Sequence, residues 1–133
     1  MYIERITHGS KVLAIILRDD YIKKGVSFVS PEEYPLQMGV HVRKQGEVVK
    51  PHIHRPFINI AEIPSQEVFH VVYGKVQVDL YKRGKKMNSC ILKDGDTILL
   101  AFSGHGIKFL EDTRMIEVKQ GPYRGIKKEK EFI

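Results

Sequence analysis

Cysteine and tryptophan are almost absent from this chain of 133 residues, which contains one cysteine and no tryptophan. Because the lone Cys90 cannot form an internal disulfide, the sequence excludes a disulfide scaffold and is typical of a reducing compartment. Long apolar runs are absent too: the longest covers residues 12–17, whereas a membrane-spanning helix needs about 20 apolar residues. No secretory signal is visible at the N-terminus. We therefore expect a cytoplasmic protein with no membrane partner.

Helical periodicity is also missing. No stretch repeats apolar residues at i, i+3, i+4 and i+7 over three turns, whereas short alternating runs recur between clusters of Gly, Pro, Asp and Asn. This pattern predicts an all-β sandwich or barrel. The length allows one domain with its own core, which we expect over residues 1–125, followed by a basic tail at 126–133. The expected strands cover residues 12–18, 25–29, 38–44, 67–73, 75–81, 88–93, 97–102, 105–110 and 113–119.

The chain carries an excess of positive charge, with 22 Lys and Arg against 16 Asp and Glu and a net charge of +6. Such a charge favours anionic partners. The basic residues gather, however, at 82–86, between two strand-like runs, and at 127–131, where both signs occur. Surfaces that bind single-stranded nucleic acid interleave aromatic residues with the charges, and neither segment does so. We therefore expect a small-molecule partner and no nucleic acid.

One acidic residue, Glu67, falls on a strand face that the alternation pattern assigns to the core. In the run 67–73 it shares this face with apolar side chains and with Tyr73. An ionised carboxylate is costly in such a place unless a cation accompanies it. Arg43 or Lys50 would meet this need as an ion-pair partner, and a metal ion held jointly with histidines would meet it as well.

Three histidines are placed so that they can join Glu67 around an ion. His52 and His54 are two residues apart, on the same face of an extended segment, and His105 follows a glycine-rich turn. Three imidazoles and one carboxylate suit a borderline divalent ion such as Fe, Mn, Ni, Zn or Co, among which the ligand types do not choose. The His-x-His pattern alone is equally consistent with exposed histidines on an edge strand.

The spacing of these residues resembles the two motifs of the cupin superfamily. A glycine, five residues and His-x-His open the first motif, and a glutamate, six residues and a glycine close it. A second glycine-led run that ends in Gly-His resembles the other motif. The matching segments are 46–54, 67–74 and 95–105, within a motif region of 46–110. The resemblance implies an all-β, double-stranded β-helix (jelly-roll) fold and a metal held by His52, His54, Glu67 and His105.

The sequence departs from the cupin pattern between the second histidine and the glutamate. Residues 55–66 lengthen this interval, and their apolar residues and prolines predict an ordered flap that lids the pocket or contacts a second subunit. Glu62 is a rival ligand within the insertion, but only Glu67 has the motif's distance to Gly74. The second motif has Ala101-Phe102 where a proline is common and lacks the trailing asparagine.

Three further residues are candidates for binding a substrate. His41 and Arg43 share one face of the run 38–44; if that face is inward they line the pocket, where Arg43 would grip a carboxylate or phosphate, and if outward they are ordinary surface. Tyr73 shares the face of Glu67 and is a candidate polar group. By the same alternation His70 points outward, and Cys90 is expected to be an inert core thiol.

The resemblance admits several functions, because fold alone does not decide function. We expect a small metal-dependent enzyme for a polar, anionic metabolite. Likeness to small stand-alone cupins suggests a sugar or nucleotide sugar, modified by an isomerase or epimerase in surface-polysaccharide synthesis. The alternatives are an iron-dependent dioxygenase and a non-catalytic ligand-binding or sensor barrel. Residues 12–17 are apolar on both faces, which predicts a homodimer that covers one of them.

Overall fold

The computed structural model describes residues 3–55, 65–100, 103–122, 125 and 130–133, and no residue among them is helical. None of the described residues belongs to a helix that could span a membrane. The strands are β1 (Ile3–His8), β2 (Lys11–Leu17), β3 (Gly25–Phe28), β4 (Leu36–Arg43), β5 (Val48–His54), β6 (Glu67–Tyr73), β7 (Lys75–Lys82), β8 (Lys85–Lys93), β9 (Thr97–Leu100), β10 (Gly104–Phe109), β11 (Thr113–Gln120) and β12 (Lys130–Phe132).

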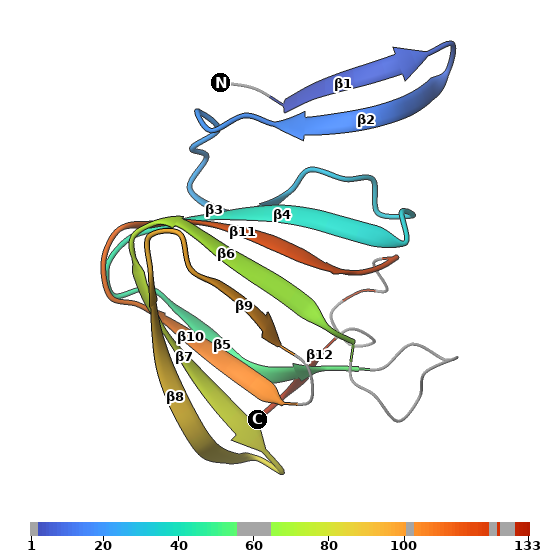
Figure 1. The fold of residues 1–133 in the computed structure, drawn as a ribbon. Coiled ribbons are helices and arrows are strands. Elements are labelled where there is room, and N and C mark those ends of the chain that lie inside the picture. The colour runs from blue at the N-terminus through green and yellow to red at the C-terminus, as the bar shows by residue number, and fades with distance from the viewer. Residues whose placement is uncertain (1–2, 56–64, 101–102, 123–124, 126–129) are drawn as a thin grey trace.

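Two five-stranded antiparallel sheets face each other and form the body of the molecule (Figure 1). One has the strand order β12-β5-β10-β7-β8, and the other has the order β3-β4-β11-β6-β9. Alternation along the strands directs apolar side chains of both sheets inward. This arrangement confirms the expected all-β fold. The buried core consists of Phe69, Val71, Val76, Val78, Leu92, Leu100, Ile107, Phe109 and Met115.

Three strands lie where the sequence pattern did not predict one. Charged residues break the apolar alternation in β1, and a proline and two histidines do so in β5. At the end of the chain, β12 pairs with β5, and its Phe132 ring lies 6.0 Å from the His52 ring. The basic segment 82–86 spans the hairpin turn between β7 and β8.

The first two strands stand apart from the two main sheets. β1 and β2 pair only with each other, and they extend beyond β3 and β4 as a separate hairpin (Figure 1). A buried side chain of β11, Arg114, holds the segment that follows this hairpin. Its guanidinium donates hydrogen bonds to the backbone carbonyls of Arg18 and Tyr21, at 2.9 and 3.3 Å.

Candidate metal centre

The two histidines of β5 lie in the interior of the molecule. His52 and His54 are buried on the same face of the strand, and His105 lies near the start of the neighbouring β10, where its Cα pairs with that of His52. Glu67, which is also buried, begins β6 in the facing sheet. Both sheets therefore contribute to one cluster, whose four candidate ligand atoms all lie within 4.8 Å of one another.

The atoms of this cluster are close together, and most of them have no hydrogen-bond partner among the described residues. His105 Nε2 lies 2.6 Å from Glu67 Oε1, yet no hydrogen bond of good geometry from any described residue reaches His105 Nε2 or either Glu67 oxygen. Buried polar atoms normally have such partners. The Nε2 atoms of His52 and His54 are 3.2 Å apart, at hydrogen-bond distance. Ligand atoms that crowd together in this way, several of them without a hydrogen-bond partner among the described residues, are arranged as around an ion. The residues present thus fit a metal, and three imidazoles with one carboxylate can hold a divalent ion.

His52 is held in the form that a metal requires. Its Nδ1 lies 2.6 Å from the backbone oxygen of Lys50; since a carbonyl only accepts, Nδ1 carries the hydrogen and donates it. The lone pair of Nε2 is then left to face the cluster. Burial, reinforced by the charge of His105, lowers the pKa of His52 to about 3. The ring is therefore neutral at neutral pH.

Glu67 is held as a carboxylate despite its burial. Burial alone would raise its pKa, but the contacts with the His105 and His54 side chains bring the pKa well below its usual range. The His54 Nε2 atom lies 3.1 Å from Glu67 Oε1. Neither Arg43 nor Lys50 forms an ion pair with Glu67 in the described structure. The positive charge that balances the Glu67 carboxylate must therefore come from within the cluster, as a metal ion between the four side chains would provide.

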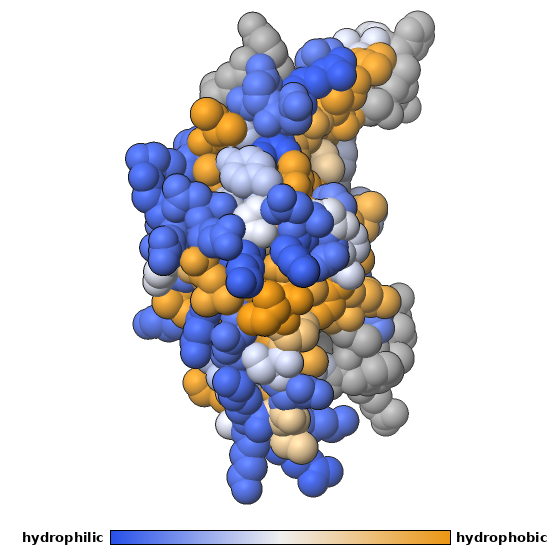
Figure 2. Space-filling model, turned by 60° about the vertical axis from the view of Figure 1, so that its left-hand side comes forward, coloured by the Kyte–Doolittle hydropathy of each residue, from blue (hydrophilic) through white to orange (hydrophobic). Residues whose placement is uncertain are grey.

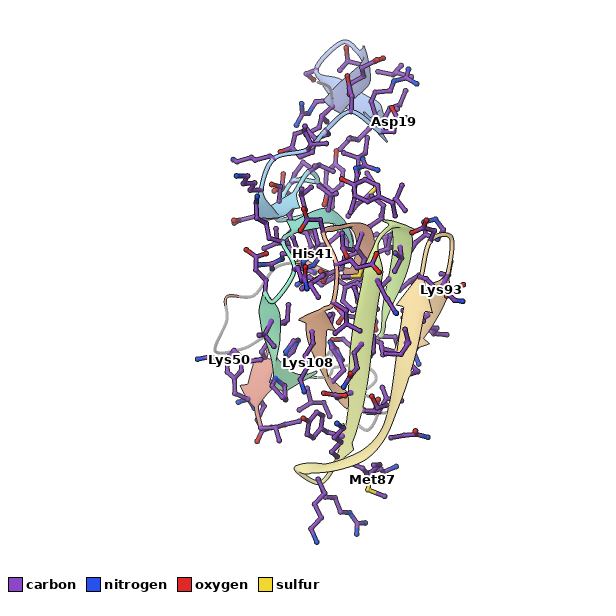
Figure 3. All side chains as sticks on the ribbon, turned by 90° about the vertical axis from the view of Figure 1, so that its left-hand side faces the viewer. Asp19, His41, Lys50, Met87, Lys93 and Lys108 are labelled. Carbon is purple, nitrogen blue, oxygen red and sulfur yellow. The ribbon has the colours of Figure 1, made fainter. Side chains whose placement is uncertain are left out.

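The cluster opens into a cavity of about 80 Å³. The opposite wall carries charged and polar side chains from β4 and β11, namely His41, Arg43, Glu117 and Lys119. His41 lies in the middle of the molecule, whereas Met87 and Lys93 lie at its edge (Figure 3). Of the two alternatives left open by the sequence, the structure thus shows the inward one for His41 and Arg43.

A chain of hydrogen bonds orders this wall. Arg43 Nε donates to His41 Nδ1 at 3.2 Å, so that His41 Nδ1 accepts and the ring hydrogen resides on Nε2. His41 Nε2 lies 2.6 Å from Glu117 Oε1 and donates to it. Both partners of this last bond are buried. No described residue bonds the second oxygen of Glu117, and the residue lines the cavity.

Tyr73 does not join this group, contrary to expectation. Its side chain is 44% exposed, and it is not among the residues that line the cavity. The register of β6 against β11 shifts between Arg114 and Met115, and this irregularity ends the alternation that would have turned Tyr73 inward.

The remaining candidates take the following places. His70 lies outside the cavity and bonds Thr97 Oγ1. Cys90 is half-buried, and burial followed by the charge of Asp79 raises its pKa, which disfavours a nucleophilic role. Glu62 and most of the expected flap lie outside the described residues.

Sequence reasoning missed three charged residues of the cavity wall, Glu117 and Lys119 of β11 and Lys130 of β12. Within β11 the apolar Ile116 and Val118 alternate with them, so a simple hydrophobic pattern places the charged pair outside. In the structure Glu117 and Lys119 are buried, whereas Ile116 and Val118 are only partly so. The opposite signs of the pair, two residues apart on one strand face, were the available signal of a polar interior.

Comparison with known proteins supports this reading of the fold. No family model matches the chain, and no curated protein matches its sequence. Its structure is similar to that of oxalate decarboxylase from Lactobacillus farciminis, solved as a formate complex, with a TM-score of 0.62 and 16% identity over 81% of this chain and 30% of that one. An oxalate oxidase gives a TM-score of 0.61 and 17% identity over 82% of this chain and 61% of that one.

A smaller protein, KdgF from Halomonas sp., gives a TM-score of 0.54 and 25% identity over 74% of this chain and 78% of that one. The chain spans about three tenths of the length of the oxalate decarboxylases that it matches. Mn(II) centres are described for the Bacillus subtilis oxalate decarboxylase. These neighbours are cupins, and this chain has the cupin fold, with a three-histidine, one-glutamate cluster able to hold a divalent metal ion.

Proposed function

We propose that this chain is a metal-dependent enzyme that moves a proton on a small anionic metabolite, in the manner of an isomerase or epimerase. One observation carries the proposal: the buried four-residue cluster opens into a cavity whose opposite wall supplies a carboxylate, Glu117, and two cationic side chains, Arg43 and Lys119. A metal site, a proton acceptor and positive charge for an anion are thus present in one enclosed space.

The metal would be held by His52, His54, Glu67 and His105. When bound, a divalent ion there would act as a Lewis acid toward a ligand oxygen. The protein's own contribution is to keep the ligand atoms oriented, through the bond from His52 to the Lys50 carbonyl, and to keep the site small and largely shielded from water.

Glu117 is the group suited to proton transfer. His41 holds one of its oxygens, Arg43 holds His41, and the second oxygen remains for a ligand in the cavity. A carboxylate fixed in this way would accept a proton from a carbon or hydroxyl of the ligand in the cavity and return it. The hydrogen bond from His41 limits its rotation and so places the free oxygen.

The substrate class follows from size and charge. A cavity of about 80 Å³ encloses only the reacting part of a sugar or nucleotide sugar, and Arg43 and Lys119 favour a negative group there. The structural neighbours named for oxalate also act on a small anion, which supports the charge of the ligand and not its identity.

The metal site is tested by elemental analysis of protein purified without added metal. Wild-type protein should retain a divalent transition metal, and Glu67→Gln and His105→Gln should lose most of it. His70→Gln is the matched control, because His70 is a histidine of the same strand as Glu67 that lies outside the cavity. Equal metal content in all four proteins would show that the cluster is not the site.

Turnover is tested by proton NMR in deuterium oxide with a panel of sugar acids, sugar phosphates and nucleotide sugars. Deuterium incorporation that needs both the metal and Glu117 supports the proposal. Oxygen consumption with iron(II) and none with zinc would instead indicate a dioxygenase. Binding of a panel member without exchange or conversion would indicate a sensor.

A further inference from the structure

Lys119 of β11 is a charged side chain in an unusual place. The residue is only 7% exposed, and lysine is almost never so deeply buried unless it is paired. Among the described residues no carboxylate forms an ion pair with Lys119. Its ammonium lies instead over the ring of Phe28, 4.6 Å from the centroid, and both residues line the cavity. The ammonium of this largely buried residue is thus held against an aromatic face, and no described carboxylate compensates its charge.

Two carboxylates are near Lys119, but neither forms an ion pair with it. The Cα of Lys119 pairs with that of Glu67 across the strands, a position in which side chains on one face are close neighbours. Glu67 nevertheless contacts the imidazoles of the cluster, and Glu117 is bonded by His41. The ammonium therefore remains to meet an anion that enters the cavity.

The position of Phe28 fixes the direction of the lysine. Its ring lies over Gly39 of β4, where an added Cβ would be only 2.8 Å from the ring. The absence of a side chain at Gly39 thus lets the ring lie across the inner face of the sheet, beneath the ammonium. Phe28 is 40% exposed, and the ammonium over its ring belongs to a residue that lines the cavity.

The geometry points to Lys119 as the anchor for a carboxylate group of the ligand, so that the substrate is a small hydroxy or oxo acid. The cavity is too small to enclose a nucleotide, and a phosphate dianion, larger and more strongly charged, would be repelled more by Glu117. The hydroxy or oxo group of this acid is assigned on the basis of the proposed function, in which it would lie near the metal. The contact between the carboxylate and Lys119 does not depend on a metal.

The anchor is tested on full-length, chelator-treated protein by calorimetric titration with glycolate, a minimal hydroxy acid. Ethylene glycol and inorganic phosphate are the comparison ligands. Glycolate should bind, and ethylene glycol should bind at least about tenfold more weakly, since a hydrogen bond to a charged group contributes about 1.5–3 kcal/mol. Phosphate should also bind more weakly, because Glu117 repels its greater charge. Weak or absent glycolate binding, or tighter phosphate binding, overturns the proposal.

Three variants test both the direction and the size of the expected change in glycolate affinity. Lys119→Met keeps the apolar stem and should weaken glycolate binding about tenfold or more, whereas Glu117→Gln removes a nearby negative charge and should strengthen it. Lys93→Met makes the same change in net charge on an exposed strand, at the edge of the molecule (Figure 3), and should have little effect. Equal effects of the two lysine variants, or weaker binding by Glu117→Gln, overturn the proposal.

Failure of this inference is distinguishable from failure of the proposed function. If no metal is found while glycolate binding still requires Lys119, the carboxylate anchor is supported and the metal-dependent reaction is wrong. If metal is retained but Lys119→Met does not change glycolate affinity, the carboxylate anchor is wrong and the metal site is supported. Lys119→Arg, which keeps the charge, should retain glycolate binding, and its loss in a folded Lys119→Arg protein also counts against the anchor.

Discussion

Burial changes the protonation of single residues in this cavity, and His52 shows it most simply. Its neutral ring is maintained by desolvation and by the neighbouring charge of His105, which lower its pKa to about 3. In the unfolded chain the same ring has a pKa of about 6.5. Below pH 6.5 the unfolded state therefore takes up a proton that the folded state excludes, and the equilibrium moves toward unfolding.

We expect the free energy of unfolding of the metal-free protein to fall as the pH falls from about 6.5 to about 3, by up to about 5 kcal/mol from His52 alone. The lowered pKa of Glu67 acts in the same direction below its ordinary value. Urea unfolding in the presence of a chelator at several pH values measures this dependence. His52→Gln should flatten it between pH 6.5 and 5; parallel profiles for the two proteins would contradict the prediction.

The candidate ligands could be predicted from the sequence because each contains its own signal. Glu67 is charged on an apolar strand face, and His52 and His54 have the spacing of a shared face. Glu117 and Lys119 had a weaker signal, their opposite signs on one strand face, and their apolar neighbours on β11 suggested the opposite orientation. Only the tertiary structure shows that this part of the interior is a polar cavity and not a hydrocarbon core.

At the scale of the elements, two motif glycines have the same backbone requirement in different surroundings. Gly46 and Gly74 both have positive φ, 91° and 116°, which residues with a Cβ rarely adopt. A Cβ at Gly46 would meet nothing within 4 Å, whereas one at Gly74 would lie 2.7 Å from the carbonyl oxygen of Asp112. Gly74 therefore also serves the close approach of the turn before β11.

Alanine at these two positions should separate strain from crowding. Gly46→Ala should lower the free energy of unfolding by about 1–2 kcal/mol, from the backbone alone. Gly74→Ala should lower it by about 2–5 kcal/mol, since a steric clash with backbone adds to the strain. Chemical denaturation of both variants beside the wild type gives the comparison. A loss at Gly46 equal to or larger than that at Gly74 would refute this account.

Most strands were predictable from alternation and turn residues, and the exceptions have physical causes. β5 contains Pro51, which removes a backbone donor and weakens a strand prediction. β12 is three residues of mixed charge, and it is a strand only because β5 offers an edge for pairing. Local sequence does not show an element whose stability comes from its neighbour.

At the scale of the whole molecule, the β1–β2 hairpin is the part that the main sheets do not stabilise. A two-stranded hairpin is marginal by itself, and this one pairs with no further strand in the part of the chain that the structure describes. Figure 2 shows hydrophobic surface exposed on the upper part of the molecule, where the hairpin stands. Ile6 is 50% exposed, and Arg114 fixes the segment that connects the hairpin to the barrel. A second copy of the chain is the simplest cover for this surface.

We therefore expect a homodimer at micromolar concentration, with the hairpin in the interface. Ile6→Lys would bury a charge in that interface, and the dimer dissociation constant should rise about tenfold or more. Val48→Lys is the control, because Val48 is similarly exposed, at 55%, but lies on β5 of the barrel. Light scattering after size-exclusion chromatography distinguishes the species. A monomeric wild type, or equal dissociation of both variants, would show that the hairpin does not form a dimer interface. Its apolar surface would then need another partner.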